Sequence, residues 1–219
     1  PYTGNVTPNE KEDFETRMRM FGYTHEDLKT IIIPMSKLAK EAIGSMGTDT
    51  PLAVLSNRPQ LLFNYFKQLF AQVTNPSIDS IREEVVMSLE CLIGPEGNLL
   101  ENNPENASRL RVQNPILSNK ELRAIRNISN ANWKTKTIDL SYLKKDGLSA
   151  MKNRLDEVCE EAEAAIHDEY SFIILSDKNT SQSHMSLSSL LACSSIHHYL
   201  TERQLRSKIG IVIETGEAR

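Results

Sequence analysis

Few residues of this chain have the types and spacing that catalysis requires, and each such set has a simpler structural explanation. Cys193 and His197 lie four positions apart on one expected helix, so a nucleophile–base pair is geometrically possible. Helix interiors more often hold such pairs as core, and no oxyanion-donor motif accompanies this one. The adjacent His197 and His198 would lie about 100° apart around a helix, so they cannot easily share one metal ion. We therefore expect no catalytic residue and no metal ligand here.

A second candidate is the glycine-containing stretch from Gly44 to Pro51, which is the nearest approach to a phosphate-binding loop. Such a loop needs backbone N–H groups at a helix N-terminus together with a lysine. Here the glycines precede an apolar run rather than a helix, and no lysine follows. A tight loop whose glycines supply positive φ explains the pattern. No cofactor-binding residue is expected in this chain.

Carboxylates and a polar loop complete the candidates. Ser80 and Glu83 have capping-box spacing, which favours a helix start over an acid–base pair. Asn75 precedes Pro76 and is therefore pushed out of the helical region, so Thr74 and Asn75 present polar side chains on a sharply shaped loop. An ordinary turn explains this loop equally well. None of these residues by itself specifies a reaction.

The elements that would position these residues differ between two parts of the chain. In residues 1–103, helices alternate with irregular segments. We expect a helix from Pro8 to about Met20, a second one beginning near Thr24 that Pro34 bends or stops, a short strand at Leu52–Leu55, and a helix after Asn57.

Residues 104–219 have a more regular pattern. Apolar residues recur every three or four positions between Gly147 and His167, which predicts one helix. The chain then continues with an apolar strand, an apolar helix and a second apolar strand. The full set of expected elements is strands at Arg109–Val112, Lys134–Leu140, Phe172–Leu175 and Ile209–Ile213, and helices at Ser118–Ile128, Gly147–His167 and Leu187–Leu200.

This order predicts the α/β class, with βα units around a parallel sheet whose strands are covered on both faces. The strands are too few for a complete eight-stranded barrel. We therefore expect an incomplete, degenerate (β/α) barrel-like domain with a helix-rich, irregular N-terminal part. The whole chain is interpreted as one domain over residues 1–219, with an irregular half (1–103) and a regular half (104–219).

Composition narrows the function classes. The 219 residues carry a net charge of −4, and basic residues are interspersed with acids, which argues against a nucleic-acid partner. No apolar run approaches the roughly 18 residues of a membrane-spanning helix. The three cysteines, Cys91, Cys159 and Cys193, are far apart and odd in number, as expected for reduced thiols in a cytoplasmic protein. The chain lacks an initiator Met and stops just after an apolar strand, so we expect a segment excised from a longer polypeptide.

Two long stretches carry a family resemblance. The sequence IGSMGTDTPLAVLS (43–56) and the sequence YFKQLFAQVTNP (65–76), continued to Leu89, are similar to the central domain of glutamate synthase large subunits. The similarity returns at Asn114–Leu117, Ile173–Asp177, Ser189–Ala192 with His197–His198, and Ile213–Arg219. It spans nearly the whole chain in the same order.

The resemblance implies a parent enzyme with several domains. An N-terminal amidotransferase domain hydrolyses glutamine, and ammonia passes through an internal tunnel to an FMN-binding barrel, where 2-oxoglutarate becomes glutamate. Electrons arrive through an iron–sulfur cluster, from ferredoxin or from a small subunit. The central domain would be a non-catalytic connection between the two active sites, and FMN and the cluster would be held elsewhere. On this reading Thr74 and Asn75 line the ammonia tunnel.

This sequence also departs from the family. Asp168-Glu169-Tyr170 lacks the usual glycine before a strand, and residues 177–186 replace a loop with more Arg and Pro by a polar one, which puts only the geometry of that loop in doubt.

Two other functions stay open. One is a free-standing βα enzyme that uses residues at the carboxyl ends of its strands, namely Ser176, Asp177, Glu214 and Glu217. The other is a stand-alone α/β module that binds a small metabolite.

Overall fold

The computed structural model describes residues 8–40, 42–43, 53–57, 60–66, 87–98, 100–129 and 133–218. The chain divides into two compact units, Pro1–Ala71 and Gln72–Ala218, and each is described by itself. The division into an irregular and a regular half at residue 103 stays a prediction. None of the described helices is long and apolar enough to span a membrane.

The first unit is helical, as the sequence predicts. Helix α1 covers Pro8–Met20. The second helix starts after Thr24, whose backbone N–H and hydroxyl each donate to the Asp27 carboxylate at 2.8 Å. It then passes through a π-helical turn at Asp27–Ile32 into α2, Ile33–Leu38.

Pro34 does not stop the second helix, which is one of the two outcomes predicted for it; a π-helical turn at Asp27–Ile32 lies directly before the proline-containing helix α2. Because proline has no N–H, the carbonyl of Thr30 lacks its usual helical donor, and this carbonyl accepts instead from the backbone N–H of Ile43 at 2.9 Å. The helix ends later, at Ala39, which is in the left-handed conformation with φ 49°.

Two other predictions for this unit are wrong. Val54 and Leu55, expected in a strand, lie in a turn and are 92% and 97% exposed. Where the structure describes the helix expected after Asn57, it has a 3₁₀ turn at Leu62–Tyr65 followed by an extended Phe66. A short apolar run has strand length, but a strand also needs a partner, which local sequence does not supply.

The second unit contains the sheet elements. In the described part of this unit the strands are β1 (Cys91–Ile93), β2 (Leu110–Val112), β3 (Thr135–Asp139), β4 (Ser141–Leu143), β5 (Phe172–Ser176), β6 (His184–Ser186) and β7 (Gly210–Glu214), and the helices are α4 (Asn119–Arg126), α5 (Gly147–His167) and α6 (Ser189–Glu202), with 3₁₀ turns at Pro104–Ala107, Lys144–Asp146 and Arg206–Lys208. The predicted helices and strands of this region are confirmed to within a few residues.

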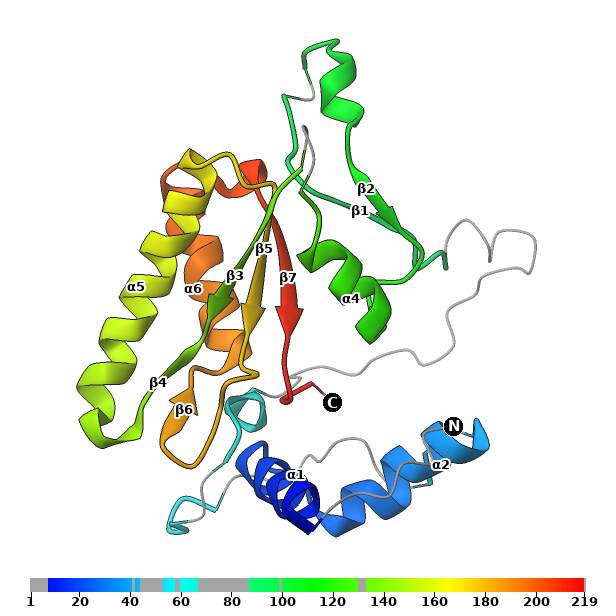
Figure 1. Ribbon diagram of the computed structural model, residues 1–219, viewed down its shortest axis with the longest axis vertical. Coiled ribbons are helices and arrows are strands. Elements are labelled where there is room, and N and C mark those ends of the chain that lie inside the picture. The colour runs from blue at the N-terminus through cyan, green and yellow to red at the C-terminus, as the bar shows by residue number, and fades with distance from the viewer. Residues whose placement is uncertain are drawn as a thin grey trace. The chain divides into compact units, whose positions relative to one another are not determined.

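A three-stranded parallel sheet in the order β3-β5-β7 is the centre of this unit. Helix α5 connects β3 to β5, and α6 connects β5 to β7. Since parallel crossovers are right-handed and both steps proceed in the same direction, α5 and α6 lie on one face of the sheet (Figure 1). The unit is thus a partial α/β domain, as the sequence predicts.

The two faces of the sheet have separate cores. On the helix face, Ile138, Ile173 and Leu175 are fully buried against α5 and α6. On the opposite face, Ile174 and Val212 pack against Ile125 of α4. Coverage of both faces explains why β5 is apolar without interruption, with every residue buried.

The strand predicted at Arg109–Val112 forms, but it does not join the parallel sheet. As β2 it pairs antiparallel with β1, with Cys91 opposite Val112. Ile93 and Leu110 of this ribbon pack against the α4 face of the sheet. The sequence reasoning missed β1, and it also missed β4 and β6, which pair antiparallel beyond the ends of β3 and β5.

Close packing at the amino end of the sheet depends on two glycines. The Phe172 ring is fully buried and meets Trp133 edge-on, with ring centroids 6.2 Å apart. A Cβ added at Gly210 would lie 3.0 Å from both this ring and the Gly94 backbone nitrogen. A larger residue at position 210 would therefore need the ring or the Gly94 backbone to shift, which explains why glycine fits this close approach.

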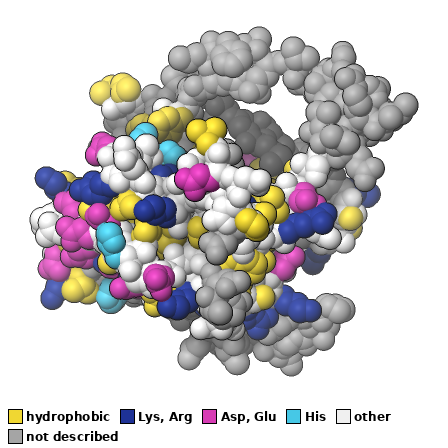
Figure 2. All heavy atoms as spheres, turned by 90° about the horizontal axis from the view of Figure 1, so that it is seen from above, with side chains coloured by type: hydrophobic (Ala, Val, Ile, Leu, Met, Phe, Trp, Pro, Cys, Tyr) yellow, Lys and Arg dark blue, Asp and Glu magenta, His cyan; other side chains and the backbone are white. Residues whose placement is uncertain are grey.

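The described surface carries mixed charge. On the face seen in Figure 2, acidic and basic side chains of the described residues are interspersed rather than separated into regions of one sign. This distribution agrees with the net charge of −4, and the described residues on this face form no basic surface of the kind that nucleic acids require.

Candidate functional site

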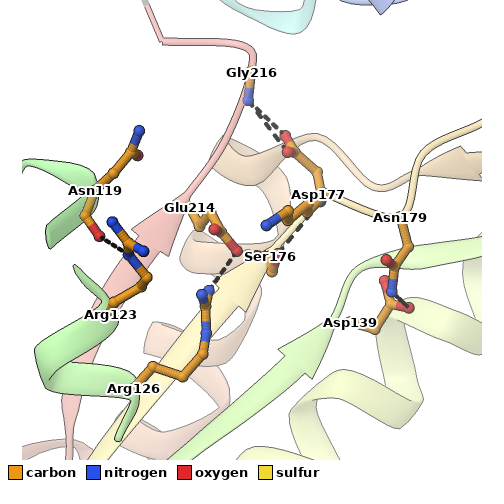
Figure 3. A network of polar contacts seen from close by, with 10 residues as sticks. Asn119, Arg123, Arg126, Asp139, Ser176, Asp177, Asn179, Glu214 and Gly216 are labelled. Carbon is orange, nitrogen blue, oxygen red and sulfur yellow. Dashed lines mark hydrogen bonds and ion pairs between the residues drawn. The ribbon is translucent and has the colours of Figure 1, made fainter. Parts of the chain in front are cut away.

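Polar side chains gather where the three parallel strands end. Asp139, Ser176 and Glu214 are the last residues of β3, β5 and β7, and the strand register places them side by side. In open α/β sheets this edge is the usual position of a functional site. It is therefore the candidate site, and Figure 3 shows its main contacts.

Glu214 is the centre of the first group of contacts. Its Oε2 accepts a hydrogen bond from the Ser176 hydroxyl at 2.5 Å and one from the Arg126 guanidinium at 2.7 Å. Arg126 points toward it from the last turn of α4 (Figure 3). Burial alone would raise the pKa of Glu214, but the bonds from Ser176 and Arg126 together hold that pKa below its usual value. Glu214 is thus held in its ionised form and joins α4 to β5 and β7.

Asp177 forms the second group. It is buried, with 3% of its surface exposed. Its carboxylate accepts from the Thr215 hydroxyl at 2.5 Å and from the backbone N–H of Gly216 at 3.1 and 3.2 Å. Burial raises the pKa of Asp177 in spite of these two donors, and the nearby charges of Glu217 and Glu214 act in the same direction. Asp177 therefore fastens the segment after β7 to the end of β5.

Glu217 forms the third group, at the start of α6. Its Oε2 accepts from the Ser189 backbone N–H at 2.9 Å and from the hydroxyls of Ser188 and Ser189 at 3.0 Å. The N-cap residue Ser188 makes no capping bond with its own side chain. A carboxylate far along the chain thus caps this helix, in the position where the helix dipole favours negative charge.

Replacing Glu217 by alanine is expected to destabilise the folded chain by about 1 kcal/mol, because the Ser189 N–H loses its acceptor and the dipole loses its counter-charge. The difference should be measured by urea unfolding at pH 7. Glu202→Ala, an exposed acid at the other end of α6, is the matched control and should change little. Equal values for the two variants would show that Glu217 does not act as a cap.

Asp139 is occupied in a similar way. Its Oδ2 accepts from Asn179 at 2.8 Å and its Oδ1 from the Ser141 N–H at 2.9 Å. Burial by itself would raise the pKa of Asp139, but these donors and the Arg154 charge lower it. Arg154 also donates to the Asp139 backbone carbonyl from Nε at 3.1 Å and from Nη2 at 2.6 Å.

Taken together, the network joins elements rather than presenting a reactive group. Each of the carboxylates accepts hydrogen bonds from neighbouring strands, loops or helices. Among the residues described, no group of three or more His, Cys, Asp or Glu side chains could hold a metal ion. These hydrogen bonds and ion pairs hold the ends of the strands to one another and to the neighbouring helices.

The candidates weighed from sequence are positioned as follows. His197 Nδ1 accepts from Arg206 Nε at 3.1 Å, and the His197 and His198 rings meet edge-on with centroids 5.3 Å apart. Burial raises the pKa of the Cys193 thiol, which disfavours the thiolate that a nucleophile would need. Thr74 and Asn75, the loop Gly44–Pro51 and the pair Ser80 and Glu83 lie outside the described residues.

The cysteines do not fit an iron–sulfur cluster. Cys91, Cys159 and Cys193 are free thiols on β1, α5 and α6. Burial raises the pKa of Cys159 to about 11, so it stays a neutral core thiol. These three thiols therefore do not supply the set of thiolate ligands that such a cluster needs.

Fold and site together define a class: a partial α/β domain whose strand-end polar residues bind one another. The chain matches the family model of the glutamate synthase central domain over residues 16–219, and it belongs to that family. It is 46% identical to the NADH glutamate synthase of Schizosaccharomyces pombe over 204 residues, which is 92% of this chain and 10% of the relative.

Other relatives differ in the electron donor that their names give. The chain is 42% identical to the large chain of the NADPH glutamate synthase of Bacillus subtilis, over 98% of this chain and 14% of the relative. It is 36% identical to the ferredoxin-dependent, chloroplastic glutamate synthase of Spinacia oleracea, over 95% of this chain and 13% of the relative. The chain thus spans only about a tenth to a seventh of the length of these relatives.

Sequence reasoning identified some of the network and missed the rest. It singled out Ser176, Asp177, Glu214 and Glu217 because they lie near the ends of predicted strands. It missed Arg126 and Arg154, which are helix residues without a local motif. A basic residue in the last turn of α4 is explained by the helix dipole, so its bond to Glu214 could not be read from the sequence.

Proposed function

We propose that this chain is the non-catalytic central domain of a glutamate synthase. It connects a glutamine amidotransferase domain to an FMN-binding synthase domain, and it forms part of the wall of the tunnel through which ammonia passes between them. The parent enzyme is an oxidoreductase of the cytoplasm that makes glutamate from glutamine and 2-oxoglutarate. FMN and an iron–sulfur cluster belong to the parent enzyme, and its electrons come from a small subunit or from ferredoxin.

The family match over residues 16–219 is the observation that supports this proposal most strongly. The network at the strand ends supports the structural part of it. Glu214, Asp177 and Glu217 each accept hydrogen bonds that hold α4, β5, β7 and α6 together. Groups used in this way stabilise a scaffold, which is what a connecting domain needs.

Thr74 and Asn75 are the proposed tunnel-lining residues. In the full enzyme, Thr74→Val is expected to raise the ratio of glutamine hydrolysed to glutamate formed clearly above one to one. The substitution removes a hydroxyl that can hydrogen-bond to passing ammonia and keeps nearly the same volume. The measurement is the amount of each product during steady turnover.

Thr74→Ser keeps the hydroxyl and should restore the one-to-one ratio. Ser194→Val, which removes an exposed hydroxyl on α6, should leave the ratio unchanged. An unaltered ratio in Thr74→Val argues against the tunnel role. Turnover of glutamine by the 219-residue chain alone, or stoichiometric flavin bound to it, overturns the non-catalytic role.

A further inference from the structure

Strand β7 lies at one side of the parallel sheet, and in the described part of the chain no strand pairs with its outer edge. The Gly210 N–H donates to the Ser171 carbonyl at 2.9 Å, on the β5 side. Because backbone groups alternate in direction along a strand, Ile211 and Ile213 turn their N–H and C=O groups away from β5. Among the described residues, no backbone group pairs with them. This edge of the sheet is therefore a template for another strand.

The opposite edge of the sheet is treated differently. Arg154 of α5 donates twice to the Asp139 carbonyl, which faces away from β5. Strand β3 also carries Lys136. Charged side chains of this kind block edge-to-edge pairing. Strand β7 has the sequence GIVIE, in which no residue before Glu214 is charged. As far as the structure describes the two edges, the β3 edge has such protection and the β7 edge does not.

A row of apolar residues runs across the face of the sheet that α5 and α6 cover, and its burial is incomplete at one end. The register aligns Ile138, Leu175 and Ile213 on neighbouring strands. Ile138 and Leu175 are fully buried beneath α5 and α6, whereas Ile213 is 43% exposed. Each of the first two strands is followed by a helix that covers this row. No described helix covers the third position of the row in this way.

The path of the chain after β7 leads toward this uncovered position. Asp177 holds Gly216 at the end of β5, and Glu217 caps α6 on the helix face. The chain is thus directed to the same face on which the two earlier crossovers lie. A right-handed crossover from there would return to the free side of β7.

We propose that the polypeptide following residue 219 in the parent protein adds one more βα-type unit to this sheet. Its helix packs beside α6 and covers Ile213, and its strand pairs parallel to β7 through the outward groups of Ile211 and Ile213. The inference rests on the proposed function, because it requires a longer parent chain. This chain covers only 10 to 14% of the length of the relatives, so a parent chain of similar length has enough residues for such a unit.

Hydrogen exchange of the full parent protein tests the strand. The amides of Ile211 and Ile213 should exchange about 100-fold more slowly in the full protein than in a parent chain truncated after residue 219. The amides of Ile174 and Leu175 in β5 should stay protected in both, which shows that the domain is folded. Fast exchange at Ile211 and Ile213 in the full protein overturns the proposal.

A matched pair of substitutions tests the helix. In the full parent protein, Ile213→Thr should lower the unfolding midpoint of this domain by several degrees, whereas Ile116→Thr, at a position that is 83% exposed, should not. In the chain that ends at residue 219, the difference between the two substitutions should be smaller, because the uncovered part of the Ile213 side chain is already exposed there. If Ile213→Thr and Ile116→Thr lower the unfolding midpoint of the full protein equally, the proposal that a helix covers Ile213 is wrong.

The outcomes separate this inference from the proposed function. Protection that rises with protein concentration would assign the edge to a second copy of the chain and refute the occupant proposed here. Protection lost only after removal of the upstream domain would refute it as well. The ratio of glutamine to glutamate is independent of these results, so the inference can fail while the tunnel role stands.

Discussion

Replacing Leu175 by alanine is expected to destabilise the second unit by about 2–5 kcal/mol, which is the range for a buried leucine whose removal leaves a cavity. Leu175 is fully buried in the central strand and lies in the core beneath α5 and α6. It has strand neighbours on both sides, Ile138 and Ile213. The site cannot collapse easily, because the sheet fixes the backbone around it.

The same substitution at Leu148 is the control. Leu148 lies in the first turn of α5 and is 81% exposed, although it belongs to the apolar residues that recur along this helix. Leu148→Ala should change the free energy of unfolding by less than about 0.5 kcal/mol. Urea unfolding followed by circular dichroism measures both. A cost for Leu175→Ala no larger than for Leu148→Ala would mean that β5 is not the centre of the core.

The sequence predicted the elements that are buried on a continuous face. Helix α5 is confirmed at Gly147–His167 and β5 within one residue, because burial imposes a periodicity that the local sequence must show. The start of α4 at the predicted Ser118 is confirmed for a similar reason, since its capping box joins Ser118 to Glu121 within one turn.

The sequence did not predict which strands pair. Strand β2 was expected in the parallel sheet, but it pairs with the three-residue strand β1. Strands β4 and β6 are equally short and lie partly in a polar loop. Three residues are too few for a periodic pattern, and pairing depends on partners far along the chain. Local sequence therefore cannot specify these ribbons.

The candidate site was only half predictable for the same reason. Glu214 was noted because it closes an apolar strand, whereas its partner Arg126 is 88 positions away and carries no motif. The role of Glu217 as a cap for α6 was also hidden. Capping is usually read within four residues of the helix start, and here the cap comes from 28 residues beyond Ser189.

Asp177→Ala is expected to destabilise the second unit by about 2–3 kcal/mol at pH 7, because the Thr215 hydroxyl and the Gly216 N–H both lose a charged acceptor in a buried position. Asp156→Ala, an exposed acid on α5, is the control and should change little. Because Gly216 would also lose its attachment to β5, the segment after β7 should become more accessible to protease. An undisturbed segment in Asp177→Ala would mean that Glu217 alone holds it.

The pH dependence of the same group tests its environment. Burial raises the pKa of Asp177 above the ordinary value of 3.8, so the folded state binds this proton more tightly than the unfolded state does. The stability contributed by Asp177 therefore falls as pH rises from about 3.8 through the raised pKa, and is constant above it.

The substitution Asp177→Asn removes this pH-dependent contribution to the free energy of unfolding. Glu214 and Asp139, whose pKa values are lowered, act in the opposite direction in both proteins and largely cancel in the comparison. The free energy of unfolding of the wild type minus that of Asp177→Asn should thus decrease with rising pH across that window. A difference that increases instead would mean that the donors Thr215 and Gly216 outweigh burial, and that Asp177 is held by charge as Glu214 is.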